Sequence, residues 1–342
     1  MKDTQIHNQI IPKNSTLPIL GNAAVRNGLM WSTDLDVEVQ TKTDLEDGLY
    51  RLAGGKWVPS DPALDTEDFP PPTEVKGPAI TFRLDPIAAK RLIACTSADE
   101  TRFILCCVLF RVHEDGITMV STDGRRLTAC EWPTMEVVAA ESQGDYIVPH
   151  GGKKNKHPLN MLMKDRKRDM IEMTLGDRLV SFDNGEQVIM VKCVEGKYPN
   201  YKQVIPATDE GMFYVDQEVM VEALKEVRPY TYNSGKHPAG GCASCPVEIF
   251  LEEDSIRIHA KDIGRAPEHE VVVPAKHVFT STPKMESIAL DVVFLLDSFM
   301  QEEGVVYVGY HDNLSPVVIG TDAGSRQVRR SDITVQMPMR IT

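Results

Sequence analysis

Short apolar and polar runs alternate along the chain, and the same order of elements recurs three times. An apolar strand, a polar turn, a second strand and then an aspartate follow one another in residues 20–34, 103–123 and 247–262. Asn27-Gly28 and Asp115-Gly116 stand in the first two turns. Such pairs between alternating apolar residues favour β-hairpins. The pattern therefore predicts three related hairpins.

A second pattern, a strand followed by a capped helix, precedes two of these hairpins. The strands are predicted at residues 80–84 and 212–215, and each is followed by an aspartate, Asp85 or Asp216. Aspartate is a favoured helix N-cap, and Pro86 suits a first helical position. The chain thus predicts two full modules, which begin near residues 78 and 210, and a shorter first one.

Each full module continues with a further strand, a helix candidate and more strands. The strands at residues 146–149 and 271–274 precede the helix candidates 158–164 and 288–300. Later strands are predicted at residues 171–175, 179–182 and 187–193, and at 305–310, 316–319 and 333–337. Each module is therefore a pseudo-duplicated α+β unit of two strand-helix-strands halves. The predicted domains are 1–77, 78–207 and 208–342.

Composition narrows the class of protein. The 342 residues are 42% hydrophobic and 25% charged, as in soluble globular proteins, and no apolar run is long enough for a bilayer. We expect a cytoplasmic protein without membrane contact. Seven cysteines, most of them in apolar runs, are expected to be free thiols. The net charge of −13 argues against a surface that binds nucleic acid everywhere.

The order of several motifs resembles the bacterial DNA polymerase III beta sliding clamp. The matching segments run along nearly the whole chain: residues 16–22, 32–38, 68–70, 101–103, STDGRRL at 121–127, EGKYPNY at 195–201, VIP at 204–206 and MPMRI at 337–341. The resemblance implies a non-enzymatic processivity factor. It also implies a head-to-tail homodimeric ring on double-stranded DNA, with helices toward a central channel and sheets outside. DNA polymerase, clamp-loader subunits and repair proteins are the implied peptide partners.

The first domain departs from this family. Residues 45–65 are rich in Gly, Asp and Pro and predict no helix, so the first domain is expected to lack both pore-lining helices. Because the family closes its ring through contacts between the first and third domains, a shortened first domain bears directly on ring closure. The alternative is a clamp-like adaptor or competitor, which binds the same peptides without closing on DNA.

Basic residues cluster in a few predicted elements despite the acidic composition. Local positive charge would attract phosphates without reading bases, which gives salt-sensitive binding. The candidate DNA contacts are Lys90, Arg91, Arg102, Lys153, Lys154, Lys156, Lys164, Arg166, Lys225 and Arg228. An ordinary solvated face is the competing interpretation.

The peptide pocket is implied by matching positions of the family motifs. The candidate lining is Leu105, Thr122, Gly124, Arg125, Arg126, Leu127, Pro199, Val204, Asp291, Phe294, Leu314, Pro316, Met337, Pro338, Met339, Arg340 and Ile341. Apolar and methionine side chains suit an extended peptide. Truncating Arg126 is expected to weaken peptide binding with folding largely intact.

Other chemistry has little support in the sequence. Cys242, Cys245 and His237 could suggest a metal or redox centre, but a zinc site needs further ligands, and incidental thiols explain the pair more simply. Neither a catalytic triad order nor a phosphate-binding loop is present. We therefore expect no catalytic residues, no metal and no cofactor. A nucleic-acid-processing enzyme centred on the cysteine pair is a remote third hypothesis.

Overall fold

The computed structural model describes residues 2–13, 15–133, 140–149, 160, 171–176, 178–206, 211–231, 245–260, 268–279, 286–321 and 332–339. The chain divides into two compact units. Unit 1 comprises Met1–Ile93, Cys106–Ile117 and Pro133–Lys197, and unit 2 comprises Ala94–Leu105, Thr118–Trp132 and Tyr198–Thr342. The predicted division into three domains stays a prediction.

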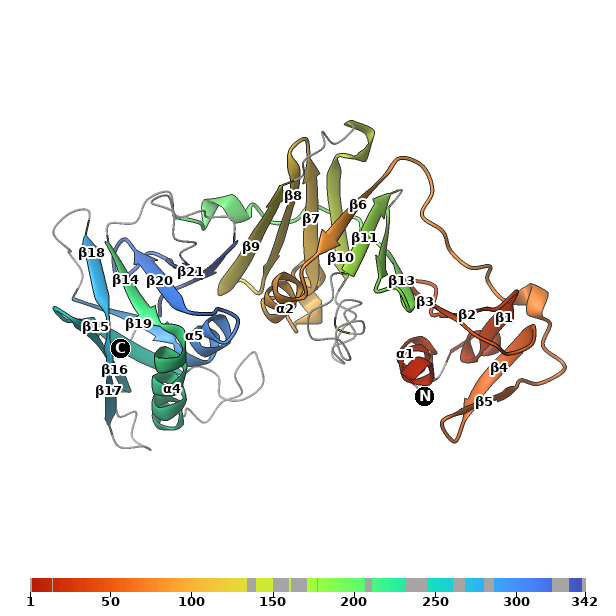
Figure 1. Cartoon of the computed structure of the whole chain (residues 1–342), viewed down its shortest axis with the longest axis horizontal. Helices are drawn as coiled ribbons and strands as arrows, with labels where there is room; N and C mark the ends of the chain where they lie inside the picture. The colour runs from red at the N-terminus through yellow and green to blue at the C-terminus, as the bar shows by residue number, and fades with distance from the viewer. Residues whose placement is uncertain are drawn as a thin grey trace. The chain divides into compact units, whose positions relative to one another are not determined.

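Unit 1 contains a nine-stranded sheet in the order β5-β4-β1-β2-β3-β13-β12-β11-β6 (Figure 1). Its strands are β1 (Ala23–Arg26), β2 (Leu29–Thr33), β3 (Val37–Lys42), β4 (Gly48–Ala53), β5 (Lys56–Pro59), β6 (Ala79–Leu84), β11 (Ile171–Gly176), β12 (Leu179–Asp183) and β13 (Gln187–Lys192). Antiparallel pairing of β3 with β13 joins the early strands to the later ones. A second antiparallel pair is formed by β7 (Cys107–His113) and β10 (Gly144–Pro149).

Unit 2 contains two sheets. In the larger one, β8 (Gly116–Thr122), β9 (Arg126–Pro133), β22 (Asp332–Gln336), β21 (Val317–Thr321), β20 (Val305–Tyr310), β14 (Gly211–Asp216) and β18 (Lys276–Phe279) lie in this order. The smaller sheet has the order β17 (His269–Pro274), β16 (Ser255–Ala260), β15 (Pro246–Leu251), β19 (Ser287–Asp291). Its core packs these strands against α4 (Gln217–Val227) and α5 (Val292–Phe299).

The predicted hairpin and capping signals are found in the structure. Asn27 and Gly28 adopt φ values of 53° and 75° between β1 and β2, the left-handed conformation that a two-residue hairpin turn requires. Asp85 precedes α2 (Pro86–Ala94), and Asp216 accepts hydrogen bonds from two backbone N–H groups at the start of α4. These local signals correctly placed two of the helices.

One predicted helix, residues 288–300, is wrong in its first third. Residues 287–291 form strand β19, in which Ile288 and Leu290 are buried, and the helix starts only at Val292. Asp291 ends the strand and caps α5 by accepting a hydrogen bond from Val293 N–H. The strand and the start of the helix lie in one apolar run, so the hydrophobic pattern does not show where one ends and the other begins. Apart from residue 160, the helix candidate at residues 158–164 lies outside the described residues.

The first segment contains a helix that the sequence did not predict. Helix α1 (Lys2–Ile10) lies against β2 and β3, and buries Ile6 and Ile10. His7 is fully buried there, where its Nδ1 is 2.8 Å from Ser32 Oγ and its Nε2 is 2.9 Å from Thr41 Oγ1. Burial lowers the pKa of His7 to about 3. The imidazole is therefore neutral and fixes α1 to the sheet.

This buried histidine predicts that unit 1 loses stability in mild acid. The pKa of His7 is lower in the folded state than its unfolded value near 6.5, so the stabilisation is present above pH 6.5 and is lost as pH falls. Between pH 7.5 and pH 5 the loss is about 2 kcal/mol. The measurement is hydrogen exchange of β2 and β3 amides across this range. His7→Gln should flatten the pH dependence; an equally steep dependence in that variant would exclude His7 as its cause.

Two further findings concern the described helices and cysteines. None of the described helices is long and apolar enough to span a membrane. Five described cysteines are free: Cys95, Cys106, Cys107, Cys130 and Cys193. Cys245, which is buried just before β15, is disulfide-bonded, so the expectation of a free thiol is wrong at this position. Cys242 and His237 lie outside the described residues.

Candidate functional site: an apolar pocket in unit 2

A concave pocket of about 200 Å³ lies within unit 2, where the turn between β8 and β9 approaches the end of β22. Two short 3₁₀ segments, Glu100–Cys106 and Tyr201–Gln203, complete its wall. The lining residues are Leu105, Thr122, Gly124, Arg125, Arg126, Leu127, Pro199, Asn200, Tyr201, Val204, Val335 and Met337. Its apolar lining, with a few polar groups, is what an extended peptide requires.

The structure brings together nine of the seventeen predicted pocket residues. These are Leu105, Thr122, Gly124, Arg125, Arg126, Leu127, Pro199, Val204 and Met337. Six others are described but do not line this pocket: Asp291, Phe294, Leu314, Pro316, Pro338 and Met339. Arg340 and Ile341 lie outside the described residues. The peptide-binding role of the set stays a prediction.

The residues that miss the pocket have identifiable structural places. Leu314 is 64% exposed in a turn capped by Asp312, on the loop before β21. Met339 N–H donates to the carbonyl of Ala289 at 2.8 Å, so the chain after Met337 runs along β19. Phe294 lies beneath Arg126 rather than in the pocket wall. The sequence pattern gave no information on how deeply each of these residues is buried.

The turn between β8 and β9 is fixed by its own polar side chains. Asp123 Oδ1 accepts hydrogen bonds from the backbone N–H groups of Arg125 and Arg126, at 2.8 and 3.1 Å. Thr122 Oγ1 donates to the carbonyl of Arg126 and accepts from Gly124 N–H. Gly124 has a φ of 89°, which a residue with a side chain rarely adopts. The STDGRRL segment thus forms a rigid pocket edge.

Arg126 is the buried charge of the site. Its side chain is 5% exposed, and it donates to the Asp123 carboxylate, the Asp297 carboxylate and the Ala94 carbonyl. Its guanidinium also lies 4.3 Å from the centroid of the Phe294 ring. A buried guanidinium needs such acceptors, because an unpaired buried charge is costly. Arg126 therefore connects the pocket edge with α5.

Arg102, a predicted DNA contact, supports the same edge. Its guanidinium donates to Asp99 Oδ2 at 3.1 Å, to Ser97 Oγ at 3.3 Å and to the carbonyl of Asp123 at 3.0 Å. These three bonds engage its Nε and both terminal nitrogens. Hydrogen bonds from Thr101, followed by those from Arg102, lower the pKa of Asp99. The structure thus gives Arg102 a role in holding the turn, which differs from the predicted one.

Three lining residues escaped the sequence-based prediction. Asn200 and Tyr201 follow Pro199 in the EGKYPNY segment, and Val335 precedes the end of β22. Tyr201 is 5% exposed, and its N–H donates to the carbonyl of Pro199 at 2.8 Å. For Asn200 and Tyr201, their place in a family motif was the available signal. A supporting aspartate such as Asp297 gave no comparable sign, because it lies within a plain apolar helix.

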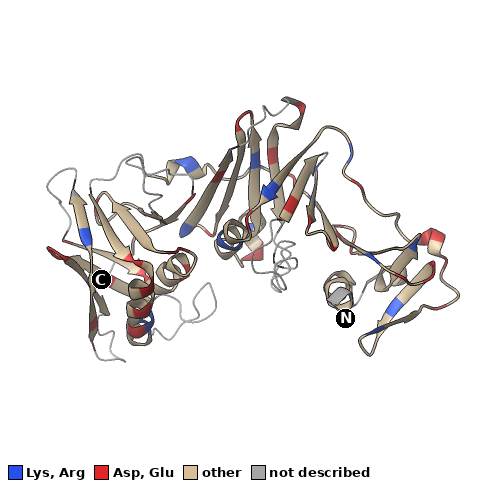
Figure 2. Cartoon of the chain, in the orientation of Figure 1, with Lys and Arg blue, Asp and Glu red and all other residues tan. Residues whose placement is uncertain are grey.

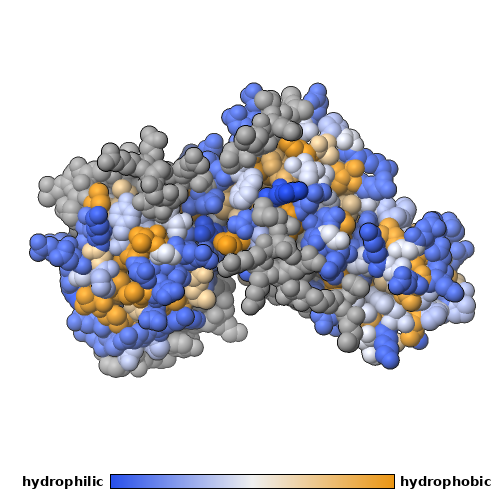
Figure 3. Space-filling view, viewed as in Figure 1, coloured by the Kyte–Doolittle hydropathy of each residue, from blue (hydrophilic) through white to orange (hydrophobic). Residues whose placement is uncertain are grey.

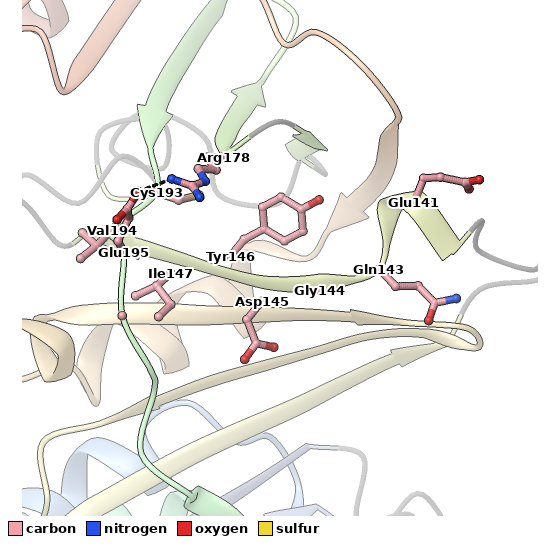
Figure 4. Close-up of a pocket in the computed structure, with 11 residues that line it drawn as sticks. Glu141, Gln143, Gly144, Asp145, Tyr146, Ile147, Arg178, Cys193, Val194 and Glu195 are labelled. Carbon is pink, nitrogen blue, oxygen red and sulfur yellow. Dashed lines mark hydrogen bonds and ion pairs between the residues drawn. The ribbon is translucent and has the colours of Figure 1, made fainter.

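A larger cavity of about 460 Å³ lies in unit 1, along the edge of β10 (Figure 4). Tyr146 points to one side of the strand, whereas Asp145 and Ile147 point to the other. Its mouth also carries Glu141 and an ion pair between Arg178 and Glu195. This lining is richer in polar and charged groups than the pocket of unit 2. It is therefore less suited to an apolar peptide.

The candidate DNA contacts are unevenly placed. On α2, Lys90 is exposed and Arg91 is half-buried, opposite buried Ala89 and Leu92. Figure 2 shows acidic residues in red beside basic residues in blue along the ribbon of α4. Exposed residues at intervals of four, Glu218, Glu222 and Glu226, form an acidic stripe on α4, which also holds Lys225 and is followed by Arg228 at its C-cap. Lys153, Lys154, Lys156, Lys164 and Arg166 lie outside the described residues.

Exposed apolar side chains do not single out another binding surface on the face in view. Figure 3 shows small hydrophobic patches separated by hydrophilic residues. Scattered exposure of this kind is ordinary for a folded protein. Among the described residues, no cluster of three or more His, Cys, Asp or Glu could hold a metal ion. The pocket of unit 2 is therefore the candidate site.

The sheets and helices of the two units have the mixed α+β architecture that is the fold class of the DNA clamps. Residues 87–200 match the family described as the DNA polymerase III beta subunit, central domain. A beta sliding clamp of Pseudomonas putida is 26% identical, over all of this chain and 97% of its own length. The Escherichia coli beta sliding clamp is also 26% identical, over 81% of this chain and 70% of its own.

Solved structures show the same fold. The DNA polymerase III beta subunit of Thermotoga maritima superposes with a TM-score of 0.76 at 20% identity, and covers 100% of this chain and 97% of its own. A Pseudomonas aeruginosa sliding clamp bound to griselimycin gives 0.75 at 21% identity, with 99% and 96% covered. The resemblance to the bacterial DNA polymerase III beta sliding clamp, which the motifs predicted, is thus confirmed by sequence and by fold.

Proposed function

We propose that this chain is a DNA polymerase processivity factor, a sliding clamp that holds its partners on duplex DNA through the pocket of unit 2. The main support is that nine residues from separated motifs line one apolar pocket. Tethering raises the local concentration of a polymerase at its template without a chemical step. The proposal therefore assigns no catalytic residue, metal or cofactor.

We also propose specific binding partners, an assembly and a location in the cell. The pocket would take peptide segments of DNA polymerase, clamp-loader subunits or repair proteins. Lys90 and Arg91 would contact the DNA backbone, and two copies would close head to tail into a ring in the cytoplasm, at the nucleoid. Helices would face its central channel, with the sheets outside. Contacts to phosphates need no base recognition, as a sliding protein requires.

A clamp-like adaptor that binds the same peptides without encircling DNA is the second candidate. The acidic stripe of α4 favours it, because Glu218, Glu222 and Glu226 oppose the phosphate backbone that a clamp helix would approach. Such an adaptor would compete with a standard clamp for partners. The peptide pocket is common to both candidates, so ring closure separates them.

The test is solution mass by light scattering, followed by retention on circular duplex DNA. We expect a dimer that remains on the circle, when loaded with a clamp loader, and leaves once the circle is cut. Griselimycin binding provides the separate measurement of the pocket, since a solved clamp is described as bound to it. A monomer without topology-dependent retention that still binds griselimycin would replace the clamp with the adaptor. Absence of griselimycin binding would count against the pocket itself.

A further inference from the structure

Helix α5 contacts Arg126 of the candidate peptide pocket through a carboxylate. Asp297 Oδ2 lies 3.1 Å from a terminal nitrogen of Arg126. The other described residues of α5 are apolar apart from Ser298, whose hydroxyl donates within the helix to the carbonyl of Phe294. Asp297 does not line the pocket, but Arg126 does. An acidic side chain on an otherwise apolar helix thus faces a pocket residue.

Different parts of unit 2 hold the guanidinium of Arg126. The Asp123 carboxylate holds its Nε at 3.3 Å, and the Ala94 carbonyl accepts from one terminal nitrogen at 2.6 Å. Asp297 accepts from the other terminal nitrogen, and Phe294, one turn earlier on α5, has its ring centroid 4.3 Å from the guanidinium carbon. Removing the Asp297 carboxylate leaves that nitrogen without its acceptor.

We infer that Asp297 is a positioning residue for peptide recognition: it holds Arg126 flat against Phe294 and thereby keeps the pocket open. This inference rests on the proposed peptide-binding function of the pocket. A guanidinium that loses one acceptor turns toward another polar environment, because a buried unsatisfied donor is costly. The pocket is the open side available to it. The displaced charge would then occupy space that the apolar part of a ligand needs.

The experiment measures griselimycin affinity in the full chain by calorimetry, together with the melting temperature of each variant. Asp297→Ala removes the acceptor, Asp297→Asn keeps an oxygen acceptor without the charge, and Asp297→Glu restores the carboxylate. We expect about tenfold weaker binding for Asp297→Ala, an intermediate loss for Asp297→Asn and recovery in Asp297→Glu, since neighbouring polar groups couple by such amounts.

Asp145→Ala is the matched control. Asp145 is also paired with an arginine, Arg111, and its side chain is 39% exposed, as is that of Asp297. It lies in unit 1, outside the peptide pocket. We expect its loss to leave griselimycin affinity unchanged. Comparing the two variants shows whether weaker binding requires the loss of Asp297 itself, or follows from the loss of any carboxylate that is paired with an arginine.

The outcomes distinguish this inference from the proposed function. If the unchanged chain binds griselimycin and Asp297→Ala binds equally well, Asp297 has no positioning role, although the pocket assignment stands. If Asp297→Ala lowers only the melting temperature, its role is structural and the inference is wrong. If the unchanged chain does not bind griselimycin, both the pocket function and the inference that rests on it are overturned. Weaker binding in Asp297→Ala with recovery in Asp297→Glu supports the positioning role.

Discussion

Reversing the two cations of α2, with Lys90→Glu and Arg91→Glu together, is expected to weaken association with duplex DNA about a hundredfold at low salt. Each phosphate that a cation no longer neutralises lowers the dependence of log affinity on log salt by about 0.9, so the slope should fall by about two. The physical reason is that fewer counterions are released on binding, while two new carboxylates repel the phosphates. The measurement is fluorescence anisotropy of labelled duplex DNA over a series of salt concentrations.

The matched control reverses two cations at the C-terminal end of α4, with Lys225→Glu in the helix and Arg228→Glu at its C-cap. We expect a smaller change, because the stripe of Glu218, Glu222 and Glu226 already makes this helix a poor phosphate ligand. Equal effects of the two double variants would show that the acidic stripe is irrelevant to DNA. An unaltered salt slope in the α2 variant would contradict DNA contact by α2.

Local signals explain why much of the fold could be predicted. Asn27-Gly28 favours two consecutive left-handed residues, and few other structures use that pair, so the hairpin of β1 and β2 follows from the sequence. Asp216 performs the capping role that its position suggested. Repetition of these signals in register also indicated an α+β repeat. All of these signals depend on interactions between residues close in sequence, so a single sequence is enough to identify them.

Elements defined by tertiary packing could not be predicted in this way. Helix α1 is mostly polar, and it is held by the contacts of His7 with Ser32 and Thr41, which are distant in sequence. Strand β19 and α5 share one apolar run, in which only Asp291 marks the change of period. Intrinsic preferences are weak beside such packing. The sequence therefore misplaced a boundary and missed a helix.

Pocket residues that lie in family motifs could be predicted from the sequence. Residues that support the pocket only through three-dimensional contacts could not. Matching motif positions identified the pocket edge from Thr122 to Leu127, but not that Arg102 would hold that edge. An arginine near other basic residues suggests nucleic acid, and only the structure shows its three internal acceptors. The same holds for Asp297, whose importance depends on where Arg126 points. The charged side chains that hold the pocket edge therefore include some that do not line the pocket.

Arg126→Ala is expected to destabilise unit 2 by about 3 kcal/mol, in addition to weakening the peptide binding that is proposed for the pocket. Breaking a buried ion pair by removing one partner typically costs about 3–5 kcal/mol. The lower value applies because Asp297 is 39% exposed and can be hydrated, whereas Asp123 is 13% exposed and cannot to the same extent. Hydrogen exchange of amides in β9 and β22 measures the effect, since these strands pair beside Arg126.

Arg125→Ala is the control for this prediction, because Arg125 lines the same pocket, carries the same charge and is exposed. Its truncation should change stability by less than about 0.5 kcal/mol, as for most surface positions. On the sequence alone, truncation of Arg126 is expected to leave folding largely intact. Because Arg126 is buried, we expect its truncation to lower stability as well. A variant Arg126→Ala with unchanged exchange in β9 and β22 would mean that Asp123 and Asp297 are stable without the guanidinium. The pocket would then depend on Arg126 for recognition alone, and the network that links α5 to the pocket edge would carry no stability.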